Sequence, residues 1–157
     1  MNTPFLKNTS NYLILALLAT TLLFFSCEKN IISNESLKCN VKAKEGSSSD
    51  LTGNWKLVKG KRVYYEPMTY DYSCKDVYYA FSSEGILTIT GNSNQEIGYP
   101  NGTYEYNFQK VPAENDGHLP YVISINGKSI PSEVVNNILE INNSSLDGEI
   151  LYLVRIE

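Results

Sequence analysis

The chain has 157 residues with 13 basic and 17 acidic side chains, which gives a formal net charge of −4. This length is enough for one domain rather than two, and the acidic balance argues against a nucleic-acid binder, because phosphate backbones are bound by clustered cations. The one locally basic segment contains Lys56, Lys59, Lys61 and Arg62, which we expect on a solvated strand or turn.

The N-terminus resembles the signal sequence of bacterial lipoproteins. Lys7 precedes an uncharged apolar run over 12–25, and a small Ser26 then stands before Cys27. The run is too short to cross ~30 Å of hydrocarbon as a helix, but it has the usual length of a signal-peptide core. We therefore expect residues 1–26 to be removed.

The resemblance implies that Cys27 carries the lipid. Such signals end in Leu, small, small, Cys, and this chain departs from that pattern with Phe24 and Phe25. Two or three acyl chains such as palmitate would then anchor the mature protein, since two chains hold a protein stably on a bilayer. Glu28 is not a strong inner-membrane retention signal, which favours the cell outer membrane, on either its periplasmic or its surface face. An ordinary secretory signal and a retained membrane helix are the alternatives.

The remaining two cysteines can form a disulfide. Lipidation uses Cys27, which leaves Cys39 and Cys74 in an oxidising compartment outside the inner membrane. Two free or buried thiols are the alternative.

The segment that follows the lipidation site is polar. Residues 28–50 end in Gly46 and a run of serines, with few large apolar side chains that could form a core. We expect residues 27–50 to form a lipidated, flexible tether and residues 51–157 to form the single folded domain.

Residues 51–157 show the two-residue period of β-strands. Tyr104, Tyr106 and Phe108 alternate with polar residues, as expected for a strand with one buried and one wet face. Short turns such as Asn126-Gly127 separate similar runs, which predicts an all-β, antiparallel meander that forms a barrel or a sandwich. The eight expected strands are Trp55 to Tyr65, Val77 to Phe81, Ile86 to Thr90, Thr103 to Phe108, Tyr121 to Ile125, Ser129 to Val135, Ile138 to Ile141, and Ile150 to Ile156.

Two connections are longer than the others. Glu66 to Asp76 joins the first expected strand to the second, and Gly91 to Asn101 joins the third to the fourth. Long loops on a compact β-domain often carry binding residues. Plain surface loops are the alternative.

The domain resembles the lipocalin-like domains of bacterial lipoproteins. It opens with Gly53 and Trp55 as Gly-x-Trp, continues with about eight strands, and has Arg155 on the last one. The resemblance implies a closed barrel in which Trp55 fills the closed end and Arg155 packs over its ring. Such a cation–π contact stabilises by ~0.5 to 2 kcal/mol, so these residues are expected to hold the fold rather than a ligand.

The barrel suggests two functions, because an eight-stranded interior is either filled by side chains or holds one small ligand. The first is binding of a small apolar or amphipathic ligand at the open end, under the loop Glu66 to Asp76. The second is a filled barrel that docks a periplasmic or outer-membrane protein through its tyrosine-bearing loops. The candidate ligand-binding residues, each of which could instead be core packing, are Tyr70, Tyr72, Tyr79, Tyr104, Tyr106 and Phe108.

Catalysis has little support in the sequence. The single histidine, His118, lies in an expected turn, and no nucleophile motif accompanies it. Cys39, Cys74 and His118 lack zinc-site spacing. We expect a binding protein that is not an enzyme and holds no metal or other cofactor.

Overall fold

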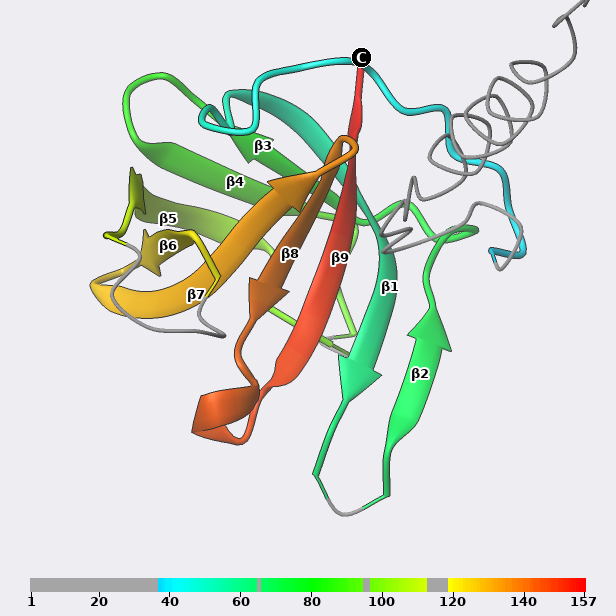
Figure 1. The fold of residues 1–157 in the computed structure, drawn as a ribbon. Helices are drawn as coiled ribbons and strands as arrows, with labels where there is room; N and C mark the ends of the chain where they lie inside the picture. The colour runs from blue at the N-terminus through cyan, green and yellow to red at the C-terminus, as the bar shows by residue number, and fades with distance from the viewer. Residues whose placement is uncertain (1–36, 65, 95–96, 113–118) are drawn as a thin grey trace, which may run out of the picture. The chain divides into compact units, whose positions relative to one another are not determined.

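The described part of the chain, residues 37–157 without 65, 95–96 and 113–118, forms nine β-strands in the computed structural model (Figure 1). The one other regular element described is a 3₁₀ turn over Ser144–Leu146. The strands are β1 (Gly53–Arg62), β2 (Met68–Asp71), β3 (Tyr78–Phe81), β4 (Ile86–Thr90), β5 (Gly102–Lys110), β6 (Tyr121–Ile125), β7 (Lys128–Val135), β8 (Ile138–Asn142) and β9 (Glu149–Ile156).

Eight of these strands close into an antiparallel barrel. From β3 to β9 each strand pairs with the next, and β1 closes the circle by pairing with β3 on one side and β9 on the other. The extra strand β2 pairs with β1. The predicted all-β antiparallel barrel is therefore confirmed, and a closed barrel of this kind is consistent with a lipocalin-like fold.

Two-residue turns set the register of the hairpins. Asn126 and Gly127 have φ of 47° and 77° between β6 and β7, and Asn136 and Asn137 have φ of 51° and 62° between β7 and β8. Asparagine and glycine tolerate positive φ better than other residues, and paired positive φ values match the right-handed twist of the strands. The sequence therefore dictates these two hairpins locally.

Strand β2 corrects one expectation. Met68–Asp71 was expected inside a loop, but it pairs with β1 from Lys59 to Arg62, whereas β3 pairs with the first half of β1. Backbone hydrogen bonds from Tyr72 N to Val58 O and from Leu57 N to Val77 O continue the ladder between the two short strands. These four residues are therefore a strand because they pair with the free edge of the ten-residue β1. Their own pattern is too short to predict a strand.

Large side chains fill the barrel interior. Trp55, Leu57, Tyr79 and Leu153 are completely buried, together with leucines and isoleucines from β4, β6, β7 and β8. Strand β1 has a β-bulge between Leu57 and Lys59, and its successive residues point to opposite faces as in any strand. Leu57 enters the interior, while Val58 joins a small outer cluster with Val41 and Val154.

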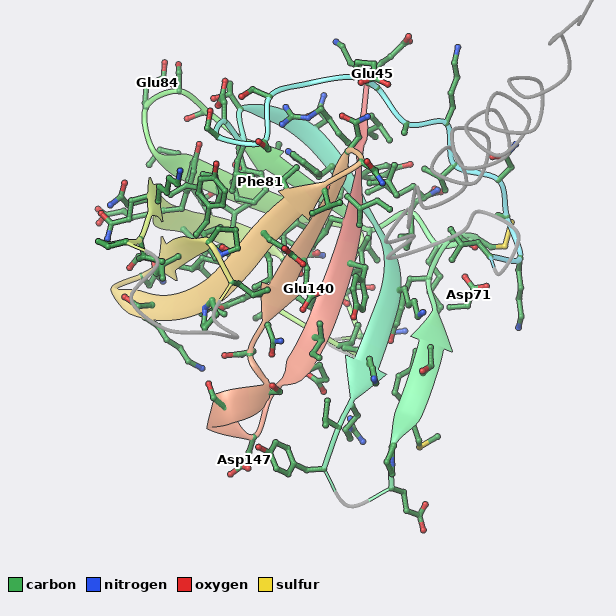
Figure 2. The ribbon with its side chains drawn as sticks, in the orientation of Figure 1. Glu45, Asp71, Phe81, Glu84, Glu140 and Asp147 are labelled. Atoms are coloured by element: carbon green, nitrogen blue, oxygen red, sulfur yellow. A yellow bond between two sulfur atoms is a disulfide. The ribbon has the colours of Figure 1, made fainter. Side chains whose placement is uncertain are left out.

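The segment 37–50, which we call the strap, lies against the outside of the barrel. Val41 covers Val58 and Val154, and Lys44 N donates to Arg155 O. Cys39 and Cys74 form a disulfide with a Cα–Cα distance of 5.1 Å, and Figure 2 shows it near Asp71. Residues 37–50 of the segment expected to be a flexible tether are thus attached to the barrel by the disulfide and by these contacts, and residues 27–36 lie outside the described residues.

Candidate binding surfaces

Trp55 and Arg155 close one end of the barrel. The Arg155 guanidinium carbon lies 4.3 Å from the centre of the Trp55 ring, and Trp55 Nε1 donates to Leu51 O at 2.7 Å. Gly53 begins β1 beside them with φ of 121°. Figure 2 shows Glu45 and Glu84 at this end, which we call the closed end, and Asp147 at the other.

The Arg155 guanidinium also fastens the strap to the closed end. It donates to the carbonyl oxygens of Ser47, Asp50 and Thr52, and the side chain remains only 7% exposed. A Cβ on Gly46 would lie 2.5 Å from Arg155 Nε, so any other residue there would displace the guanidinium. Burial lowers the pKa of Arg155 while the Asp50 charge opposes this, and the guanidinium keeps its charge at neutral pH.

At the opposite end, which we call the mouth, residues Ile97–Asn101 fold over the barrel. Ile97 is 2% exposed, and the Asn92 side-chain amide donates to the carbonyl oxygens of Ile97 and Tyr99 at 2.8 and 2.7 Å. Tyr99 N donates to the buried Tyr79 hydroxyl at 3.4 Å. Residues 97–101 of the long connection Gly91 to Asn101 therefore cover the mouth instead of forming a plain surface loop.

A cavity of about 210 Å³ remains between this covering segment and the rim of the mouth. Its charged lining residues are Lys128 at the start of β7 and Glu149 at the start of β9. Arg62 Nη2 lies 3.3 Å from Glu149 Oε1. The cavity lining consists of Gly98, Tyr99, Lys128, Ile141, Asn143, Glu149 and Leu151.

The candidate tyrosines do not meet in one site. Tyr79 is fully buried, and its hydroxyl accepts from the covering segment. The Tyr104 hydroxyl donates to Pro100 O at 2.8 Å in the same segment, whereas the Tyr106 hydroxyl donates to Ser82 O at 2.7 Å in the β3–β4 turn. Each hydroxyl therefore fixes a piece of backbone.

Two of the candidates share a shallow hollow. Tyr106 and Phe108 line about 230 Å³ together with Asp50 and neighbouring strap residues. Phe108 also stacks on Tyr121, with ring centres 4.8 Å apart. The hollow opens beside the closed end and is separate from the mouth cavity, because the two have no lining residue in common.

The last two candidates belong to the β2 region. Tyr72 is 3% exposed and lies under the Lys75 ammonium, 5.0 Å from its ring centre. Tyr70 packs against the core, while its hydroxyl donates to Met68 Sδ at 3.4 Å. The Arg62 guanidinium lies 5.8 Å from the Tyr70 ring.

The connection between β1 and β2 carries an exposed apolar cluster. Val63, Tyr64 and Met68, which we call the hairpin tip, are 37%, 45% and 46% exposed, and they are the large hydrophobic residues exposed in the described chain. Figure 1 shows this hairpin extending beyond the other connections at the mouth. Sequence reasoning did not single out this cluster, although three large apolar residues beside Glu66 and Pro67 were a usable signal.

Two sequence-derived candidates, Cys27 and His118, lie outside the described residues. Within the described ranges, no three His, Cys, Asp or Glu side chains stand close enough together to hold a metal ion. No helix in that part of the chain has the length and apolarity needed to cross a membrane.

Comparisons with known proteins give no relative. No family model, no curated protein and no solved structure matches the chain.

Proposed function

We propose that this protein is a lipid-anchored binding module that docks a partner protein through its hairpin tip. The observation that carries the proposal is the gathering of Val63, Tyr64 and Met68 at the end of one projecting hairpin. Scattered exposed apolar residues need no explanation, but a cluster on a protruding element is typical of interaction sites.

The filled interior supports docking over storage of an apolar ligand inside the barrel. Trp55, Tyr79 and the aliphatic residues of the core occupy the space that a ligand would need. An eight-stranded barrel is wide enough for side chains or for a small ligand, and here the side chains take it.

The chemistry of the tip favours a protein over a lipid surface. Tyrosine, methionine and arginine are enriched at protein interfaces. Here Tyr64 and Met68 are exposed, and Arg62 is the cross-strand partner of Met68. The exposed Glu66 lies between Tyr64 and Met68 in the chain, and a carboxylate is costly to bury in hydrocarbon. A protein surface can pair that charge.

Cys27 supplies the anchor in this proposal. An acylated Cys27 would hold the barrel at a membrane, and the disulfide between Cys39 and Cys74 would then limit how far the domain moves from it. Fatty-acid labelling of cells that express the wild type and Cys27→Ala tests the anchor, and label that persists in Cys27→Ala contradicts it.

A site-specific photo-crosslinker tests the docking surface. Placed at Tyr64 in the full-length protein, it is expected to capture one main protein partner in the cells of origin. The matched control places the same group at Glu84, an exposed residue at the closed end (Figure 2). Capture should disappear when Val63 and Met68 are both changed to Asp, and equal capture from the two positions would refute the proposal.

A further inference from the structure

We infer that the mouth cavity binds a free amino acid as its zwitterion. The site lies between the covering segment and the barrel rim, outside the filled interior. It is independent of the hairpin tip proposed for partner docking, so either proposal can fail without the other.

The two charges of a zwitterion have opposite counterparts in the cavity lining. Lys128 is exposed on the rim, and no carboxylate lies within ion-pair distance of it in the described chain. Glu149 presents a carboxylate on the same lining, and Arg62 contacts only one of its oxygens. A ligand carboxylate would pair with Lys128, and a ligand ammonium would pair with the remaining acceptor capacity of Glu149.

Residues of the cavity lining also carry buried oxygens that have no hydrogen-bond partner. Four buried side-chain polar atoms lack a hydrogen-bond partner in the described residues, and two of them, Tyr99 Oη and Asn143 Oδ1, belong to residues of this lining. Leaving such an atom unpaired costs about 1 to 3 kcal/mol, so the fold retains a defect that a polar ligand would relieve. Both oxygens are shielded in this structure, and a change of rotamer, at χ1 for Tyr99 and at χ2 for Asn143, is needed to expose them to a ligand.

Size and the apolar part of the lining limit the ligand further. A volume of about 210 Å³ falls below the ~300 Å³ at which sites for drug-sized ligands begin, which suits a molecule of amino-acid size. Ile141 and Leu151, which are 0% and 2% exposed, lie beneath one side of the cavity as an aliphatic floor. A Cβ on Gly98 would lie 2.7 Å from the Tyr79 hydroxyl and 2.9 Å from Leu151 Cδ1, so glycine lets the covering segment pack closely on the barrel here. An aliphatic amino acid such as leucine matches these features.

Calorimetric titration of the full-length protein with L-leucine tests the inference. The matched probes are L-leucinamide, which lacks the carboxylate, and 4-methylpentanoate, which lacks the ammonium. We expect leucine to bind at least about tenfold more tightly than either probe, because each probe leaves one charge of the site unpaired. If leucine and a panel of the other common amino acids do not bind, or if leucine binds no better than both probes, the inference is wrong.

Two variants assign the charges. Lys128→Ala should weaken leucine binding about tenfold and leave leucinamide binding unchanged, whereas Glu149→Gln should weaken leucine binding and leave 4-methylpentanoate binding unchanged. This crossed pattern is specific to direct pairing, since a general structural effect would weaken all three ligands together. Leucine binding that is insensitive to both variants would place the ligand elsewhere and overturn the inference.

Discussion

The closed end and the mouth of this barrel each hold a segment of irregular backbone, but side chains bind its carbonyl groups differently at the two ends. At the closed end a single guanidinium, that of Arg155, donates to two strap carbonyls and to Thr52 O while it covers the Trp55 ring. At the mouth, Asn92 binds two carbonyls of the covering segment. Two buried oxygens there, those of Tyr99 and Asn143, lack a described partner, whereas the closed end has one such atom, Arg155 Nε.

The difference indicates where stability and binding are located. The closed end combines a large buried ring, a cation–π contact and the attached strap, all of which stabilise the folded state. The mouth carries the cavity and, beside it, the exposed hairpin tip. Binding surfaces are often less well satisfied than the scaffold that positions them, because a ligand or partner completes them.

The largest expected effect comes from Trp55→Ala. This change removes the largest buried side chain, leaves a cavity, and takes away the partner of Leu51 O and of the Arg155 guanidinium. We expect the free energy of unfolding to fall by about 3 to 5 kcal/mol, measured by urea denaturation. The matched change at the mouth, Tyr64→Ala, should alter it by less than about 0.5 kcal/mol. Equal losses would contradict the contrast between the two ends.

Removal of the disulfide should have the next largest effect. The bridge between Cys39 and Cys74 closes a sequence separation of 35 residues, which corresponds to about 3 to 4 kcal/mol of lost chain entropy in the unfolded state. The double variant Cys39→Ser, Cys74→Ser should lose most of this stabilisation. It should also uncover Val58 and Val154, so that nearby backbone amides exchange their hydrogens faster. If the strap amides stay as protected as in wild type, the strap is held by Arg155 and Val41 alone.

The sequence predicted the barrel because its evidence is repeated along the chain. Alternating side chains in β5 and Asn-Gly at the β6–β7 turn each favour the same meander, and pairing of β1 with β9 follows once the strands are in order. Strand β2 and the packing of the strap could not be predicted in this way. Met68–Asp71 depends on the edge of β1, and the strap depends on single contacts made by Val41 and Arg155, which no local pattern shows.

The binding surfaces were harder to predict for the same reason. Tyrosines suggested a ligand site, but composition does not reveal which hydroxyl finds a backbone carbonyl, as those of Tyr104 and Tyr106 do. The mouth cavity brings Tyr99, Lys128 and Glu149 together from three distant parts of the chain. Only the closed barrel makes them neighbours.

The same substitution, tyrosine to phenylalanine, can be made at each end of the barrel, and we expect smaller changes in stability from it. Tyr106→Phe removes a hydroxyl that donates to Ser82 O, so we expect a loss of about 1 kcal/mol in the free energy of unfolding. Tyr99→Phe removes a hydroxyl without a described partner and should be neutral or slightly stabilising in the absence of ligand. Urea denaturation of both variants measures this, and a greater loss for Tyr99→Phe would show that its hydroxyl already has a partner.

The smallest expected effect is on stability at acid pH, through the carboxylate that attaches the strap. Burial would raise the pKa of Asp71, but hydrogen bonds from the Ser73 hydroxyl and from the backbone N–H groups of Lys38 and Ser73 outweigh it and lower the pKa below its ordinary 3.8. A folded-state pKa below the unfolded value stabilises the fold above the unfolded pKa, and this contribution is lost as the pH falls through the folded pKa.

Asp71→Asn should therefore destabilise the protein slightly at pH 7, and the difference from wild type should shrink as the pH is lowered below about 3.8. Urea denaturation at neutral and acid pH measures the two differences. The control is Asp147→Asn at the mouth (Figure 2), which removes the same charge far from the strap. Because Asp71 holds Lys38 N directly, only its variant should also speed hydrogen exchange at that amide. A pH-independent difference for Asp71→Asn would mean that its carboxylate does not hold the strap in solution.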